Sequence, residues 1–121
     1  MFIKSFILPS AKKDGKSVCV VRLSGRLDAL FSEEVEKRLD LLLEEGNNLF
    51  IIDFGDVPYI GSSGIRVLLA FYSKLKMRKG CCGLFSFPSS GFKIIQTMQI
   101  EKFFNIFPSE KEALDFVTTN S

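Results

Sequence analysis

Leu49-Phe-Ile-Ile-Asp-Phe-Gly-Asp-Val-Pro-Tyr-Ile-Gly-Ser-Ser-Gly-Ile-Arg-Val-Leu-Leu69 is the stretch that decides the fold. It begins with an unbroken apolar run, Leu49 to Ile52, which is typical of a strand buried on both faces. After a turn-rich segment, Gly61-Ser62-Ser63-Gly64 precedes a helical pattern of apolar residues and predicts the start of a helix. The two hydroxyls would then lie beside the unpaired amides and positive dipole end of that helix, where a phosphate is favoured.

Upstream of this stretch the sequence predicts a hairpin and a helix. Residues 2–8 and 17–24 have the composition of strands, and Asp14-Gly15 between them indicates the hairpin loop. The helix that follows has Ser32 as its expected N-cap and Gly46 as its stop, because these residue types favour those positions.

The central helix is apolar on two sides. Gly80 is expected to end it. Two explanations of the wide apolar surface stay open at this point: the helix is sandwiched inside the core, or a partner covers one side. The first side consists of Ile65, Leu68, Leu69, Tyr72 and Leu75, and the second of Val67 and Phe71.

The remaining chain completes an alternating pattern. We expect a strand at 81–87, a short helix at 92–99, an aromatic edge strand at 103–107, and a last helix that a Ser109-x-x-Glu112 capping box begins. The order β-β-α-β-α-β-α-β-α predicts a single α/β domain over residues 1–121. It would consist of a mixed sheet with an opening hairpin, β-α crossovers and about four helices packed on the sheet.

The composition excludes several classes of function. The 121 residues contain no histidine, the usual general base for a serine or cysteine nucleophile and the commonest metal ligand, which argues against a hydrolase. A net charge of +2 is too small to indicate direct binding of nucleic acid. No apolar run is long enough for membrane insertion and no signal peptide is recognisable, so we expect a cytoplasmic protein.

The three cysteines, Cys19, Cys81 and Cys82, form no C-x-x-C pair. Cys81 and Cys82 are neighbours in an expected strand, so their side chains point to opposite faces and cannot share a metal. We interpret all three as small apolar residues of the core.

Three interpretations of Gly61-Ser62-Ser63-Gly64 compete. The serines can simply cap the helix. A phosphate-cradling loop is also conceivable, although the lysine and the spacing of a P-loop are missing. A serine nucleophile would need the G-x-S-x-G spacing and a histidine base, and the chain has neither.

The chain resembles the anti-sigma factor antagonists of the STAS-domain family. The resemblance rests on Leu23-Ser24-Gly25-Arg26-Leu27-Asp28, on Ile52-Asp53-Phe54 through Val57-Pro58-Tyr59-Ile60, and on Ser62-Ser63-Gly64-Ile65 with Leu68-Leu69. It covers the order of elements over about residues 2–118, nearly the whole chain. The Ser-Ser-Gly start of a helix after an apolar strand is its most specific part.

The resemblance implies a binding switch without catalytic residues or cofactors. In the family, the first serine of Asp-Ser-Ser-Gly is phosphorylated by an anti-sigma factor that is also a serine kinase, and a PP2C-type phosphatase resets it. That serine matches Ser62, and Ser63 is the alternative acceptor. The unphosphorylated antagonist binds the anti-sigma factor and frees the sigma factor. The surface expected to contact this partner consists of Asp28, Gly61, Ser62, Ser63, Gly64 and Arg66.

One position departs from the family pattern, because the aspartate before the serine pair is Gly61 here. Two alternatives therefore stay open: a phosphorylated switch, or a STAS scaffold or transporter-associated subunit that is not phosphorylated. An enzyme acting on phosphorylated small molecules would have only Asp28, Asp53 and Asp56 near the loop, and we interpret these as structural or interface residues.

Overall fold

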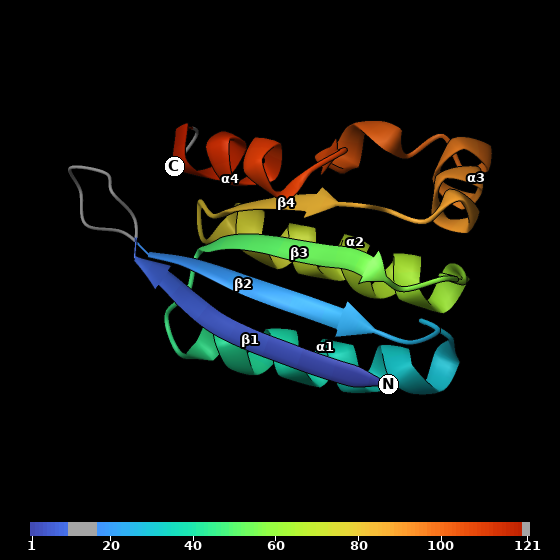
Figure 1. Cartoon of the computed structure of the whole chain (residues 1–121), viewed down its shortest axis with the longest axis horizontal. Helices are drawn as coiled ribbons and strands as arrows, with labels where there is room; N and C mark the ends of the chain where they lie inside the picture. The colour runs from blue at the N-terminus through green and yellow to red at the C-terminus, as the bar shows by residue number, and fades with distance from the viewer. Residues whose placement is uncertain (10–16, 120–121) are drawn as a thin grey trace.

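The computed structural model describes residues 1–9 and 17–119, which form a five-stranded sheet, four α-helices and a short 3-10 helix. The strands pair in the order β1-β2-β3-β4-β5 (Figure 1). The β1–β2 pair is antiparallel and the others are parallel, so the predicted opening hairpin and crossovers are confirmed, while Asp14-Gly15 lies outside the described residues. The strands are β1 (Phe2–Pro9), β2 (Ser17–Ser24), β3 (Leu49–Asp56), β4 (Cys81–Phe85) and β5 (Ile106–Phe107).

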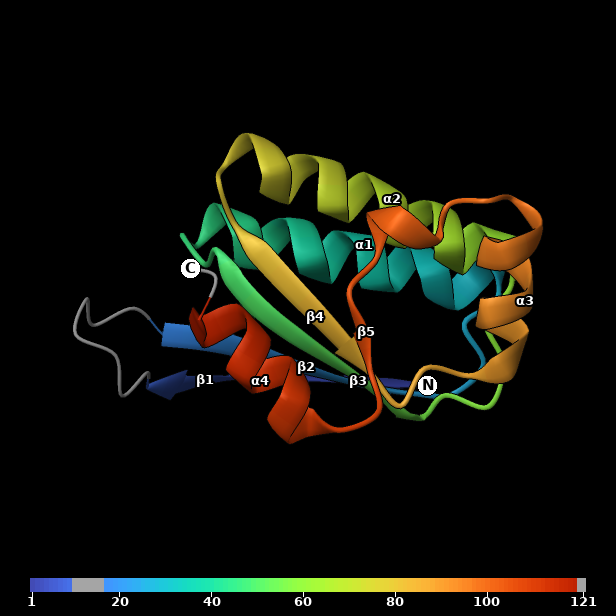
Figure 2. The ribbon, with the colours of Figure 1, turned by 90° about the horizontal axis from the view of Figure 1, so that it is seen from above.

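The helices cover both faces of the sheet, as Figure 2 shows. Helices α1 and α2 lie side by side on one face, α4 lies on the other, and α3 closes one end of the sheet. This arrangement confirms the predicted α/β architecture. The helices are α1 (Ala29–Glu44), α2 (Ser62–Met77), α3 (Ser89–Thr97), η1 (a 3-10 turn, Glu101–Phe103) and α4 (Glu110–Thr119).

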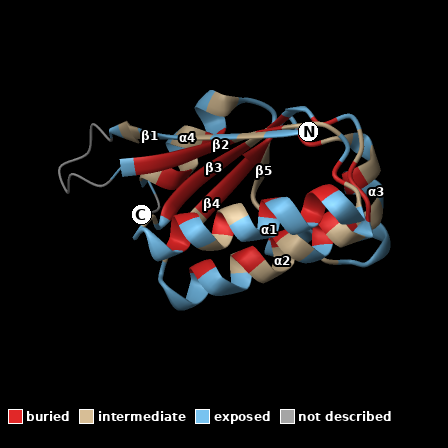
Figure 3. Ribbon diagram, turned by 90° about the horizontal axis from the view of Figure 1, so that it is seen from below, coloured by how far each residue is buried: buried red, intermediate tan, exposed pale blue. Residues whose placement is uncertain are grey.

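The central strand β3 supplies the core of both layers. Phe50 and Ile52 pack toward α1 and α2, while Leu49 and Ile51 pack toward α4, and all four are buried. This alternation follows from the two-residue period of a strand. Burial of each such side chain contributes about 1.5–3 kcal/mol, so the apolar run predicted from the sequence does anchor the fold. Figure 3 shows the buried residues on the sides of α1 and α2 that face the sheet.

The second side of α2 is covered by the chain itself. Phe71 is buried and meets Phe50 edge to face, with 4.9 Å between the ring centroids. Val67 is half-buried against the same core, so the first explanation, a sandwiched helix, accounts for this side. On the other side, Leu69 and Tyr72 are only half-buried and border an open groove.

Two predicted helix ends are wrong. Helix α1 begins at Ala29 with Asp28 as its N-cap, so Ser32 lies inside the helix and is buried there. Asp28 prevails because a cap at that position lets the helix bury Phe31. Helix α2 ends at Met77, and the left-handed residue that follows its end is Lys79, at φ 57°, not Gly80. Gly80 is needed for a different reason, since a Cβ there would lie 2.6 Å from the carbonyl oxygen of Asn48. Gly46, at φ 95°, stops α1 as predicted.

The last third of the chain differs in detail from its prediction. The expected strand at 103–107 is a 3-10 turn followed by the two-residue edge strand β5, and the short helix begins at Ser89 rather than at 92. The strand expected at 81–87 is shorter, Cys81–Phe85. Ser109 caps α4 as expected, accepting a hydrogen bond from the amide of Glu112 at 3.3 Å.

Within the described ranges, no helix is long and apolar enough to cross a membrane, and no cluster of potential ligands could hold a metal ion. Cys19 and Cys82 are buried and Cys81 is half-buried. Burial raises the pKa of the Cys19 thiol to about 11 and raises the pKa values of the Cys81 and Cys82 thiols as well, so all three stay protonated at neutral pH. These properties support the interpretation of the cysteines as core residues.

Candidate functional site

Two loops at the carboxyl ends of β2 and β3 are joined into one surface. Leu27 and Ile60 form an isolated parallel bridge. The amide of Leu27 donates to the carbonyl of Tyr59 at 2.8 Å, and the amide of Gly61 donates to the carbonyl of Leu27 at 3.1 Å. The sheet therefore continues for one step beyond its strands, and α1 and α2 both begin from this bridge. Ligand and partner sites of α/β sheets commonly lie at this edge.

Asp28 is fixed at the start of α1. Its Oδ1 accepts a hydrogen bond from the amide of Phe31 at 3.0 Å. Its carbonyl oxygen accepts from the hydroxyl of Ser32 at 2.5 Å, and from the amide of the same residue at 2.9 Å. The carboxylate is half-exposed, so it caps the helix and still presents a negative charge to the surface.

Ser62 and Ser63 occupy the first two positions of α2, as predicted. Gly61 is the N-cap and supplies no side-chain acceptor, and the first turn contains no acidic residue. Ser62 is exposed and Ser63 is half-buried. The positive end of α2 is therefore uncompensated by its own side chains, and the hydroxyl of Ser62 lies closest to solvent there.

The glycines on either side of the serines have different functions. A Cβ on Gly64 would lie 2.8 Å from Cγ1 of Ile60 and 2.9 Å from Cγ of Leu27, so its absence lets α2 pack directly on the bridge. A Cβ on Gly61 would lie 3.1 Å from the hydroxyl oxygen of Tyr59. The space that a side chain would need at position 61 is thus partly taken by a tyrosine.

Arg26 and Tyr59 extend this surface, and the sequence patterns did not predict either of them as a site residue. The guanidinium of Arg26 lies over the ring of Tyr59, 4.3 Å from its centroid, in a cation–π contact. The pair could have been predicted from the parallel pairing of the two loops, because that pairing places residues 26 and 59 at neighbouring positions.

The structure brings most of the predicted surface together. Asp28 adjoins Gly61 because Leu27 and Gly61 are hydrogen-bonded, and the Ser62–Gly64 turn follows directly. Arg66 is exposed one turn further along α2, on the same side as Ser62, since residues four apart in a helix are neighbours. A loop acid, an exposed hydroxyl and a helix arginine are thus within reach of a single partner.

Of the other two carboxylates near the loop, Asp53 has a structural partner. Asp53 accepts from Arg22 at 2.6 Å and from the amide of Gly55 at 2.8 Å, and Arg22 also contacts Glu110 at 3.1 Å. Hydrogen bonding to Asp53 and Glu110 raises the pKa of the Arg22 guanidinium. This ion-pair cluster connects β2, β3 and α4, which supports the interpretation of Asp53 as structural.

A sequence model of the STAS domain matches residues 10–113. The chain belongs to the STAS domain family. The resemblance that the sequence suggested is therefore confirmed, together with its α/β fold. The members related to this chain include anti-sigma factor antagonists, which are generally not enzymes.

Three relatives illustrate the similarity of this STAS domain to such antagonists. BtrV of Bordetella bronchiseptica, provisionally named an anti-sigma factor antagonist, is 27% identical over 97 residues, or 80% of this chain and 79% of BtrV. An anti-sigma factor antagonist from Mycobacterium paratuberculosis is 26% identical with a TM-score of 0.73, over 97% of this chain and 95% of that one. The phosphorylated form of SpoIIAA from Bacillus shares the fold, with a TM-score of 0.68 and 20% identity over 96% of this chain and 99% of that one.

Proposed function

We propose that this STAS domain is a cytoplasmic anti-sigma factor antagonist that is switched by phosphorylation of Ser62. It binds an anti-sigma factor of the serine-kinase type through Asp28, the Gly61–Gly64 turn and Arg66. The single observation that carries the proposal is the exposed hydroxyl of Ser62 at an uncapped helix start, beside the carboxylate loop of Asp28. A PP2C-type phosphatase returns the protein to its binding form.

The physics of this position fits a switch that leaves the fold intact. A phosphate on Ser62 adds about −1.5 to −2 charge at pH 7. The amides and dipole at the start of α2 stabilise that charge, so the domain stays folded. The phosphate instead weakens the complex, because the partner's surface must then accommodate added bulk and added negative charge. Each 1.4 kcal/mol lost there weakens binding about tenfold.

The first experiment identifies the acceptor. The protein is incubated with ATP and a cognate kinase-type anti-sigma factor, and the intact mass is measured. We expect the addition of one phosphate, which Ser62→Ala abolishes and Ser63→Ala retains. Ser89→Ala is a matched control, because Ser89 is exposed at the first position of α3 in the same way. Phosphate retained by Ser62→Ala would show that the assignment is wrong.

The second experiment tests the consequence for binding. Ser62→Asp should weaken binding of the anti-sigma factor by about tenfold or more, measured by calorimetry, because it brings negative charge to the contact surface. Ser89→Asp provides the control and should bind like the wild type. Equal affinities of the wild type and Ser62→Asp would contradict the switch.

Gly61 favours a second candidate, a STAS scaffold or transporter-associated subunit that is not phosphorylated. The family aspartate is missing at this position, and the hydroxyl of Tyr59 takes part of the space that its side chain would need. Stable binding of a partner without any transfer of phosphate in the first experiment would support this candidate over the switch.

A further inference from the structure

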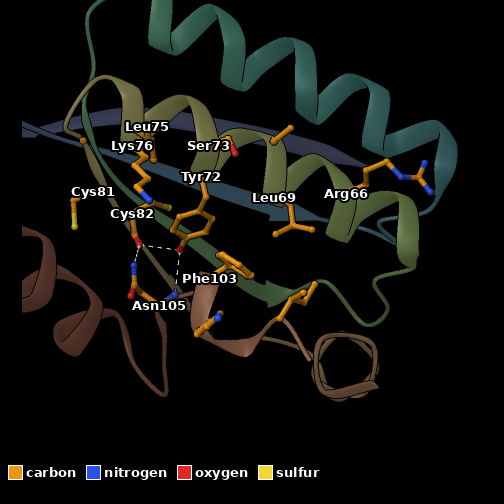
Figure 4. A pocket seen from close by; sticks show the side chains of 14 residues that line it. Arg66, Leu69, Tyr72, Ser73, Leu75, Lys76, Cys81, Cys82, Phe103 and Asn105 are labelled. Carbon is orange, nitrogen blue, oxygen red and sulfur yellow. Dashed lines mark hydrogen bonds between the residues drawn. The ribbon is translucent and has the colours of Figure 1, made fainter. Parts of the chain in front are cut away.

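A groove lies beside α2, away from the Ser62 surface. It runs between α2 and the segment that contains η1 and β5, and its volume is about 770 Å³ (Figure 4). Sites for small molecules commonly measure about 300–1,000 Å³. The groove is therefore of a size that suits one small molecule, whereas a protein partner would need a more extended face.

The walls of the groove are mainly apolar. In Figure 4 the side chains of Leu69 and Tyr72 project from α2 into it, and the ring of Phe103 projects toward them from η1. Phe103 has 52% of its surface exposed, which is high for a large apolar side chain in a folded domain. An apolar body placed here would cover surface that is now in contact with water.

The floor of the groove is fixed by hydrogen bonds within the protein. The hydroxyl of Tyr72 donates to the carbonyl of Cys82 at 2.8 Å and accepts from the amide of Asn105 at 3.4 Å. The side-chain amide of Asn105 also donates to the carbonyl of Cys82, at 3.2 Å. Phe104 packs edge to face on the ring of Tyr72, with 5.5 Å between centroids. Because these polar groups satisfy one another, the floor is preformed and does not require a polar ligand.

All charge on the lining has one sign. Arg66, Lys76 and Lys102 line the groove, and none of the 14 lining residues is acidic. In the part of the chain that the structure describes, none of these three cations takes part in a salt bridge. Three cations without an acidic partner, around apolar walls, are complementary to a molecule with an apolar body and an anionic group.

We propose that the groove between α2 and η1 binds a single-chain anionic amphiphile of the fatty acid class. The alkyl chain lies over Leu69, Tyr72 and Phe103. The carboxylate lies beside one of the cations that line the groove, where it gains charge-assisted hydrogen bonds. Arg66 borders both this groove and the surface around Ser62.

The test uses dodecanoate at concentrations below its micelle-forming range. Binding to the full chain is followed by calorimetry and by the NMR shifts of residues that line the groove. We expect saturable binding of one molecule per chain. Dodecyltrimethylammonium, with the same chain and the opposite charge, should bind at least about tenfold more weakly, which corresponds to 1.4 kcal/mol.

Variants locate the site. Ala70→Trp fills the groove and should abolish binding, and thermal unfolding verifies that the variant is folded. Lys76→Gln combined with Lys102→Gln should weaken dodecanoate binding about tenfold. The matched control is Lys93→Gln with Lys111→Gln, because both of these exposed lysines lie outside the groove and should be replaceable without effect.

Several outcomes would overturn the proposal. These are the absence of saturable binding, equal affinity for the cationic amphiphile, undiminished binding by folded Ala70→Trp, and equal losses in the two lysine pairs. A stable dimer whose interface contains Phe103, detected by light scattering and NMR, would also overturn it by showing that a second copy covers the groove.

Discussion

The chain contains two Ser-Ser-Gly helix starts that are alike in position and differ in use. Ser62-Ser63-Gly64 opens α2 after β3, and Ser89-Ser90-Gly91 opens α3 after the neighbouring parallel strand β4. In both helices the first serine is exposed, the second is half-buried and the glycine is buried. Neither N-cap residue supplies a side-chain hydrogen bond.

The start of α3 is a structural support for the start of α2. The hydroxyl of Ser90 accepts a hydrogen bond from the amide of Ile60 at 3.1 Å. A Cβ on Gly91 would lie 2.5 Å from Cγ2 of Ile60 and 2.4 Å from Cε2 of Phe87. The Ser-Ser-Gly motif alone therefore does not define a partner surface. At α2, the adjoining loop supplies Asp28 at the same edge, which is the additional feature on which the proposed function depends.

The largest effect should come from adding a methyl group to the two glycines. Gly91→Ala should lower the free energy of unfolding by about 2–3 kcal/mol, because the new Cβ meets a rigid ring, as overpacked sites do. Gly64→Ala should cost less, about 1–2 kcal/mol, because the side chains of Ile60 and Leu27 can rotate away. Urea unfolding measures both values. A larger cost at Gly64 would reverse the roles that we assign to the two helix starts.

Replacement of the second serine should likewise cost more stability at the start of α3 than at the start of α2. Ser90→Ala leaves the buried amide of Ile60 without its acceptor and should cost about 1–2 kcal/mol. Ser63→Ala should change stability by less than about 0.5 kcal/mol, because no hydrogen bond of the Ser63 side chain occurs within the described residues. Equal costs in urea unfolding would mean that Ser63 also has a structural role.

Replacement of the N-cap residue at a third helix start, that of α1, should have an intermediate effect on stability. At α1, unlike at α2 and α3, the N-cap side chain accepts a hydrogen bond, through Asp28. Asp28→Ala should therefore cost about 1 kcal/mol in thermal or urea unfolding. Asp28→Ser keeps a capping oxygen and should restore most of the loss, while removing the charge that the partner would contact. If Asp28→Ser lowers the free energy of unfolding as much as Asp28→Ala does, the charge of Asp28, not its capping hydrogen bond, stabilises α1.

The smallest effect should be shared by both Ser-Ser-Gly starts. Neither helix has an acid in its first turn, so Ser62→Asp and Ser89→Asp should each stabilise the fold by about 0.3–1 kcal/mol. The gain should fade at high salt, which screens exposed charges. Ser62→Asn and Ser89→Asn are the uncharged controls. Destabilisation by either aspartate would argue against a start of α2 that tolerates phosphate.

The sequence was most informative where the local pattern and the core agree. The apolar run of β3, the hairpin pairing of β1 with β2 and the start of α2 at the Ser62-Ser63 pair were all predicted and are confirmed. Residues that look alike locally were harder to assign. Ser32 has the chemistry of an N-cap, but the packing of Phe31 moves the N-cap back to Asp28.

The parts of the site that escaped prediction depend on contacts between distant segments. The Arg26–Tyr59 contact and the bond from the amide of Ile60 to Ser90 join residues about 30 positions apart, and no local pattern encodes them. The groove beside α2 also depends on the position of Phe103 in η1. The predicted strand at 103–107 would have placed this side chain differently. The roles of Ser62 and of the partner surface stay predictions.

The bridge between Leu27 and Ile60 has a consequence for how this surface can be recognised. Asp28 and Ser62 are more than thirty positions apart in the chain, and only the bridged loops bring them to one edge. A protein that contacts both residues therefore recognises a conformational epitope, not a linear motif. A synthetic peptide containing Ser62 and its flanking residues would present the hydroxyl without the carboxylate loop. An enzyme specific for this surface should therefore ignore such a peptide, and also the urea-unfolded chain.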